Sequence, residues 1–176
     1  MADRAKRTVR ILLLLVLLLV PAYYWYSRIE NIRSQYQVAE RAEPQRDIRG
    51  TCWKDFIAEM SKQSQLLITW GVLLLAGVTA LATTTKIHPI PNVEWVYLLL
   101  APATSFLLGS LWAGVVFERR LTYLMNKDGF GSVSSLYGLL GVQSELFEYG
   151  VVPLGLFALC FLATIVWGAM KPFDLK

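Results

Sequence analysis

Side chains that carry catalytic chemistry are scarce in this sequence. It has one histidine, His88, and two cysteines, Cys52 and Cys160, in 176 residues. One histidine cannot supply the several ligands that a haem pair or a zinc site needs. Cys52 lies in a polar stretch and Cys160 in an apolar one, so we expect two free thiols and no disulfide. We therefore predict that the protein is not an enzyme and has no catalytic residue, metal site or cofactor.

Charged residues are also few. They make up 17% of the chain, where soluble domains have about 25%. Arg10 and Glu148 lie at the edges of long apolar runs whose interiors contain no Asp, Glu, Lys, Arg or His. Proton relays and ion-coupled carriers need ionisable groups inside the membrane. The net charge of +4 includes no basic run beyond the N-terminus. These features argue against a coupled transporter or pump and against a nucleic-acid partner.

Apolar residues are abundant instead and are gathered into four long runs. They make up 55% of the chain, and the mean hydropathy is +0.46. The sequence predicts an all-α fold: a polytopic integral membrane helical bundle of four transmembrane helices, with two polar loops on one side and a single membrane domain over 1–176. The predicted spans are 9–26, 66–85, 95–117 and 146–170, joined by a polar, amphipathic loop at 27–65, a short turn at 86–94 and a loop with a helical extension at 118–145.

The first span follows a basic segment, as the apolar part of a signal peptide does. An aromatic belt, Tyr23 to Tyr26, stands where a cleavage site would lie, and such belts mark the headgroup level of retained helices. We therefore expect an uncleaved anchor. Lys and Arg close to the first span orient a membrane protein, so we predict cytoplasmic N- and C-termini in a plasma or inner membrane.

Small residues recur at every fourth position of two spans. Residues four apart share one helix face, and close approach over small residues is a main source of helix association in lipid. We therefore expect the third span to be the packing centre of the bundle. The predicted helix-packing residues are Ala101, Ser105, Gly109 and Ala113 in one row, Ser110 and Gly114 in a second, and Ala76 and Ala80 in the second span.

The two long loops contain amphipathic segments. Pro44 and Gly50 are expected to break the helix that leaves the first span, and Thr51 to cap the next one. Beyond it, Trp53 and Phe56 begin an apolar face. This face either lies in the membrane interface, where Trp53 and Phe56 would contact lipid or a partner, or packs against the protein's other loop.

The other long loop has two features of interest. Arg119 and Arg120 follow the third span and either bind lipid phosphates or a partner's acidic patch, or act as a snorkelling anchor, which we favour. The apolar pattern of residues 133–140 predicts a short, separate amphipathic segment that is interfacial or re-entrant.

Three classes of function are compatible with these features. We expect a non-enzymatic multi-pass subunit that assembles through small-residue faces with its own copies or with other membrane subunits, and presents its long loops to partners. The alternative is a homo-oligomeric ion channel or pore, constitutive or triggered as an effector. A lipid- or quinone-acting enzyme ranks lowest, because its only acids at headgroup depth are Glu118 and Glu145 or Glu148. The pore of a channel would be lined by Thr69, Thr79, Thr83 and Thr84.

Overall fold

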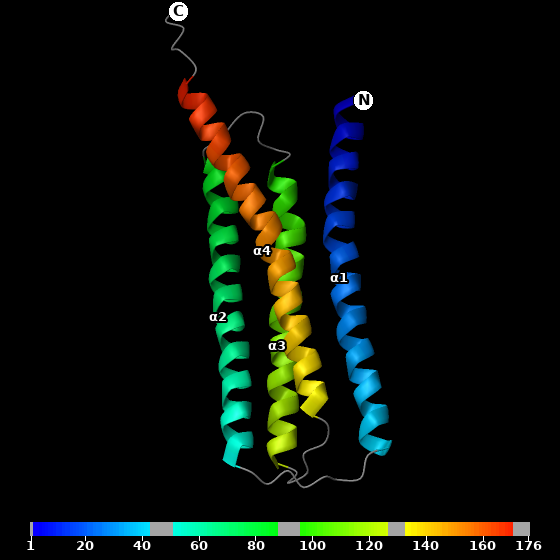
Figure 1. The fold of residues 1–176 in the computed structure, drawn as a ribbon. Coiled ribbons are helices and arrows are strands. Elements are labelled where there is room, and N and C mark those ends of the chain that lie inside the picture. The colour runs from blue at the N-terminus through cyan, green and yellow to red at the C-terminus, as the bar shows by residue number, and fades with distance from the viewer. Residues whose placement is uncertain (1, 43–50, 88–95, 127–132, 171–176) are drawn as a thin grey trace, which may run out of the picture.

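The computed structural model describes residues 2–42, 51–87, 96–126 and 133–170, and this part of the chain is entirely helical. Four long helices run alternately up and down, side by side (Figure 1). In chain order the elements are α1 (Ala2–Ala42), α2 (Thr51–Ile87), the short 3-10 helix η1 (Val96–Leu99), α3 (Leu100–Asn126) and α4 (Val133–Met170).

Each of the four helices is long and apolar enough to cross a membrane. The qualifying segments are Thr8–Ser34, Asp55–Ala80, Leu100–Tyr123 and Leu136–Ala163. The prediction of an all-helical chain with four such helices is confirmed at this level. The helices are longer than their apolar runs require: α1 has 41 residues, about 60 Å at ~1.5 Å per residue, twice the ~30 Å thickness of a hydrocarbon core.

The two long segments expected to be loops are largely helical in the described residues. α1 continues to Ala42 and α2 begins at Thr51, on either side of the expected break. α4 begins at Val133 and continues without interruption into the last apolar run. The amphipathic piece expected as a separate element is therefore the first part of α4. Gly141 alone does not end that helix, because one helical glycine costs only about 1 kcal/mol relative to alanine.

α3 occupies the centre of the bundle and contacts all three other long helices. Half of its apolar span is buried, against 6% of the span in α1 and 17% in each of α2 and α4. The first half of α1 lies beside the bundle in Figure 1, and its side chains, such as Leu12 and Leu19, are exposed on the protein surface.

One core cluster lies at the end where α1 and α3 finish. Half-buried Ile32 and Phe56 pack against it. The apolar face that follows Trp53 therefore packs against the protein's own helices, the second of the two arrangements considered from the sequence. In water or at an interface, each buried side chain of this kind contributes ~1.5–3 kcal/mol. The cluster consists of Ile57 and Met60 of α2, Phe117 and Leu121 of α3, and Leu136 and Leu139 of α4.

Two further clusters lie along the bundle. Ile29 of α1 packs with Ala113 of α3 and with α4 in the middle. Toward the other end, Val78 of α2, Leu100 of α3 and Phe157 of α4 form the third cluster. Figure 1 shows how α4 leans across α3 and reaches α2 at this end, away from α1.

A proline lies inside α1 and another inside α4, Pro21 and Pro153. Proline supplies no N–H to the carbonyl four residues earlier, and its ring disturbs that turn. Near Pro21, the hydroxyl of Ser105 donates to the carbonyl oxygen of Leu18 at 3.1 Å. The carbonyl that loses its helical donor is that of Leu17, so Ser105 bonds to the next carbonyl of the turn that Pro21 disturbs. Ser105 therefore joins α3 to α1 by a hydrogen bond as well as by its small size.

Candidate functional site

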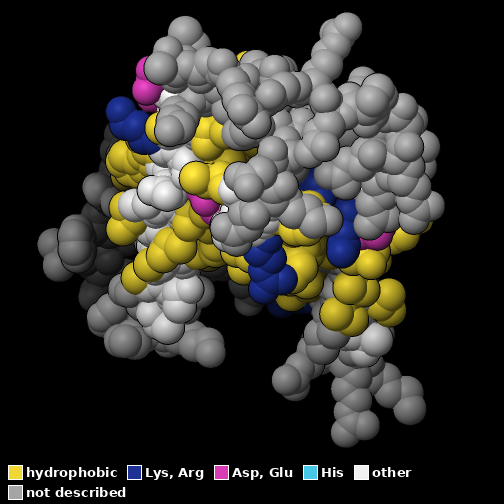
Figure 2. Space-filling view, turned by 90° about the horizontal axis from the view of Figure 1, so that it is seen from below, with side chains coloured by type: hydrophobic (Ala, Val, Ile, Leu, Met, Phe, Trp, Pro, Cys, Tyr) yellow, Lys and Arg dark blue, Asp and Glu magenta, His cyan; other side chains and the backbone are white. Residues whose placement is uncertain are grey.

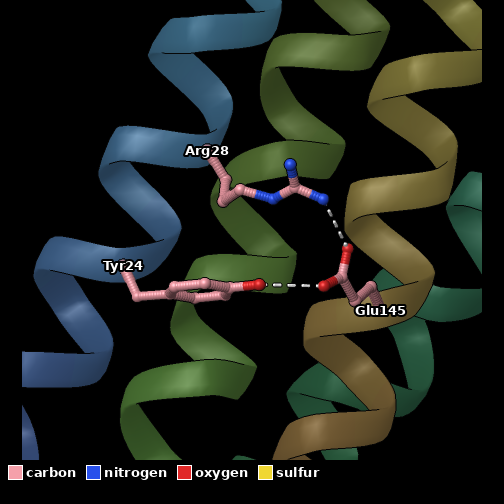
Figure 3. A network of polar contacts seen from close by, with 3 residues as sticks. All are labelled: Tyr24, Arg28 and Glu145. Carbon is pink, nitrogen blue, oxygen red and sulfur yellow. Dashed lines mark hydrogen bonds and ion pairs between the residues drawn. The ribbon is translucent and has the colours of Figure 1, made fainter.

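A polar cluster joins α1 to α4 where the apolar run of α1 ends and that of α4 begins. Tyr24 and Arg28 lie one turn apart on α1 and both reach toward Glu145 of α4 (Figure 3). The Tyr24 hydroxyl donates to Glu145 Oε1 at 2.9 Å. Arg28 Nη2 donates to Oε2 at 3.3 Å. The side chain of Arg28 is 47% exposed and that of Glu145 is 29% exposed. An ion pair this open to solvent contributes at most ~1 kcal/mol.

Aromatic rings pack around Tyr24 of this cluster. Phe106 of α3 lies 5.6 Å from the ring of Tyr149 and 6.4 Å from that of Tyr24, centroid to centroid, both nearly edge to face. The rings of Tyr24 and Tyr149 lie 6.5 Å apart. Each aromatic pair of this geometry adds ~0.5–1.5 kcal/mol beyond its buried area. Tyr24 and Tyr149 are both exposed on the surface. We call this group the α1–α4 seam. It combines one cation, one carboxylate and aromatic rings, two of which are exposed on the surface. Its residues are Tyr24, Arg28, Phe106, Glu145 and Tyr149.

A second polar group is fully buried among α2, α3 and α4. Gln143 Nε2 donates to the carbonyl oxygen of Ser64 at 3.1 Å, and the Ser110 hydroxyl donates to the carbonyl oxygen of Gln143 at 2.8 Å. Among the described residues, Gln143 Oε1 and Ser64 Oγ have no hydrogen-bond partner. Gly114 provides the space for this glutamine, because a Cβ there would lie 2.7 Å from Gln143 Nε2.

A further hydrogen bond joins α2 to α3. Next to the buried glutamine, Ser61 donates to Glu118 Oε1 at 3.3 Å. Toward the other end of α3, Leu107 and Ala103 are fully buried and Phe157 is 1% exposed, and the polar residue buried between them, Ser105, bonds to the carbonyl oxygen of Leu18.

The small rows of α3 are occupied by neighbouring helices of the same chain. A Cβ on Gly109 would lie 2.6 Å from Cγ of Trp25 in α1. Ser105, Ser110, Ala113 and Gly114 are buried, and Ala101 is half-buried. A matching close approach occurs at Gly150 of α4, where a Cβ would lie 2.8 Å from Leu107 Cγ. The packing surface of α3 is therefore used within the protomer.

The small row of α2 has the opposite orientation. Ala76 and Ala80 are exposed, and a Cβ on Gly77 would meet nothing within 4 Å. The opposite side of the helix carries buried Gly71 and Val78, which face the bundle. Ala76 and Ala80 therefore do not pack within this chain and point away from it.

The charged and aromatic residues expected at the interface have distinct environments. Arg119 is exposed, and the Arg120 guanidinium lies over the Tyr123 ring at 5.4 Å from its centroid. Phe56 packs against Tyr137, with ring centroids 5.2 Å apart. In the view along the bundle axis, Lys, Arg, Asp and Glu side chains lie around this end with hydrophobic side chains between them (Figure 2).

Several residues considered from the sequence lie outside what is described. His88 and the side chains of Cys52, Trp53 and Thr84 belong to this set. Cys160 is exposed and not in a disulfide. No group of three or more His, Cys, Asp or Glu in the described ranges could hold a metal ion. Glu118 and Glu145 bond to different helices, α2 and α1, so the structure does not pair them.

Sequence reasoning missed the two polar groups that link the helices. It treated Tyr24 only as part of an aromatic belt and assigned no role to Arg28 or Gln143. A signal was present: Tyr24 and Arg28 are four residues apart and share a face, and Glu145 precedes the last apolar run at the same depth. The partner choice still depended on which helices are neighbours. Comparison with protein-family models, curated proteins and solved structures finds no match for this chain.

Proposed function

We propose that the protein is a four-span integral membrane protein, with all four long helices crossing the bilayer. The four qualifying helices support this placement, as do the many large apolar side chains exposed along them. Contiguous apolar surface of this extent is unfavourable in water and marks contact with lipid or a partner. The helices then continue on one side of the membrane as a polar-surfaced section around the cluster of Met60 and Phe117. By the excess of Lys and Arg at Arg4 to Arg10, both termini are cytoplasmic, in a plasma or inner membrane.

Within that membrane, the protein acts as a non-enzymatic subunit that assembles through the outer face of α2. Five exposed residues at three- and four-residue spacing form this α2 outer face, on the side opposite buried Gly71 and Val78. They are Thr69, Leu73, Ala76, Ala80 and Thr83. Beyond Leu73 the described face carries only alanines, a threonine and the adjacent open Gly77, so another helix can approach its backbone closely.

α2 also exposes large side chains, Leu66 and Trp70 among them, but these precede the small part of the face. On α4, the exposed small residues Gly155 and Ala158 alternate with large ones such as Leu159, and α3 exposes Trp112. The contrast is the observation that carries the proposal: α3 uses its small rows inside the protomer, and α2 leaves its small row outside. The partner at the α2 outer face is a transmembrane helix, from a second copy or from another membrane protein.

The test is a substitution that fills the face without touching the protomer core. Ala80→Leu adds a large side chain where the protomer has none, so the fold is expected to be retained while the assembly is lost. Ala158→Leu on exposed α4 is the matched control and should keep the assembly. Native mass spectrometry of each variant, extracted gently from its own membrane, reads the result. An Ala80→Leu complex of wild-type size would refute the proposal.

A homo-oligomeric channel is the second candidate, favoured by the hydroxyl groups on α2. If the partner is a second copy, exposed Thr69, Thr79 and Thr83 would surround the axis of the assembly. Each hydroxyl donates to a carbonyl of its own helix, for example Thr69 to Gln65 at 2.8 Å, leaving its oxygen lone pairs to line a pore. In this arrangement the pore forms between copies of the chain. Ion flux in liposomes that Thr69→Val and Thr83→Val reduce would support a channel, and electrically silent bilayers would exclude it.

A further inference from the structure

The α1–α4 seam lies where the uncharged apolar runs of α1 and α4 end, within the longer qualifying segments Thr8–Ser34 and Leu136–Ala163. The apolar run of α1 ends near Tyr26 and that of α4 begins at Leu146. Tyr24, Arg28 and Glu145 are at one level because they contact one another. With the four helices placed across a bilayer as proposed above, phosphate and amine groups of phospholipids therefore lie beside this cluster.

Arg28 provides the cationic half of the cluster. Its hydrogen bond to Glu145 comes from one terminal nitrogen, and Figure 3 shows the other turned away from the carboxylate. Nearly half of the side chain is exposed. A guanidinium has five N–H donors in a planar fork that matches the oxygens of a phosphate. Arg28 can therefore hold Glu145 and a phosphate oxygen at the same time.

Glu145 and the aromatic rings provide the anionic half. The carboxylate is partly exposed and accepts from the hydroxyl of Tyr24, whose ring packs with those of Tyr149 and Phe106 at centroid distances of 6.5 and 6.4 Å. A carboxylate beside aromatic faces is the environment that an alkylammonium group prefers. The same carboxylate repels a phosphate that brings no positive charge of its own.

We infer that this seam binds the headgroup of a zwitterionic phospholipid, with its phosphate on Arg28 and its ammonium group against Glu145 and the tyrosine rings. An anionic lipid satisfies only the arginine. A zwitterionic headgroup carries a phosphate and an ammonium group in one lipid molecule, so it can satisfy both charges. The inference rests on the proposed membrane placement but is independent of any assembly through the α2 outer face.

Lipid titrations of the purified full chain in detergent test the inference, with bound lipid counted by native mass spectrometry. Phosphatidylethanolamine and phosphatidylglycerol of identical acyl chains are the two probes. The wild type is expected to prefer phosphatidylethanolamine. Glu145→Gln keeps an oxygen for the Tyr24 hydroxyl but removes the charge, and should reduce phosphatidylethanolamine binding about tenfold, the effect of one lost charge-assisted contact. Binding of phosphatidylglycerol should stay equal or increase.

Two controls separate headgroup binding from the helix-to-helix contact. Glu59→Gln, on an exposed position of α2, makes the same charge change away from the seam and should bind like the wild type. Tyr24→Phe breaks the bond to Glu145 but keeps the ring, so the lipid preference should persist. Equal binding of both lipids by the wild type, or an unchanged preference in Glu145→Gln, would overturn the inference while leaving the membrane placement intact. Retention of neither lipid would likewise overturn the inference.

Discussion

The contact between Gly109 and Trp25 is the sharpest packing constraint in the described bundle. A Cβ on Gly109 would lie 2.6, 2.8 and 3.0 Å from Cγ, Cδ1 and Cδ2 of the indole. Cγ is the ring atom nearest the backbone, so no end of a flexible side chain can swing away. Trp25 also packs against Ile29 and Ala113 in the middle cluster. Accommodating one methyl group therefore requires α1 to move away from α3.

Gly109→Ala is expected to destabilise the protein by ~1–3 kcal/mol, the usual cost of overpacking a tight interior. Gly155→Ala on α4 is the control, because a Cβ there would meet nothing within 4 Å. It should stabilise by up to ~1 kcal/mol through the higher helix propensity of alanine. The two variants introduce the same methyl group, but the expected changes in the free energy of unfolding have opposite signs.

Equilibrium unfolding in a mild detergent measures both variants, with the far-ultraviolet circular dichroism of the helices as the readout. Tryptophan fluorescence, read with Trp25 as the one tryptophan kept of the six, reports separately whether the α1–α3 contact has opened. Wild-type stability in Gly109→Ala would refute the geometry of this contact. Equal destabilisation by Gly155→Ala would show that glycine itself, and not the indole, sets the cost.

Two further predictions concern the core. Met60→Ala should destabilise the protein by ~2–5 kcal/mol, because Met60 is 3% exposed in the cluster with Phe117. In the same unfolding experiment, Leu159→Ala at an exposed position should change the stability by less than ~0.5 kcal/mol. Equal effects of the two variants would contradict the assigned cluster. Gln143→Leu removes one hydrogen bond of ~1 kcal/mol but also removes Oε1, a buried acceptor without a partner among the described residues, whose burial costs ~1–3 kcal/mol. This variant should therefore unfold at or above the wild-type denaturant midpoint, and a loss of more than ~2 kcal/mol would show that the amide has a further role.

The helices and their number could be predicted from the sequence because the apolar runs are long. The central position of α3 could be anticipated from its small rows, since small residues permit close approach on several sides. Gly109 and Gly114 have that environment, one against Trp25 and the other against Gln143 and Ile68. Helix periodicity could not show that Ala76 and Ala80 point outward, because the same spacing describes a face toward the bundle or away from it.

The helix-linking polar groups could not be predicted for a different reason. Pairing Glu145 with Tyr24 and Arg28 requires α1 and α4 to be neighbours, although the residues are 121 and 117 positions apart. Nothing in the local sequence fixes that neighbourhood. The face that begins at Phe56 was similarly undetermined, because a membrane interface and a neighbouring helix select the same amphipathic pattern. The structure places it against Tyr137 and the α3–α4 pair.

The central claim is that this chain works as part of an assembly. Native mass spectrometry of the wild-type protein, extracted gently from its own membrane, tests it most directly. The account predicts a complex of fixed composition: other chains at constant stoichiometry identify an accessory subunit, and several copies alone direct attention to flux measurements. A single chain with bound lipid and no other protein, over a range of gentle extraction conditions, would contradict the account.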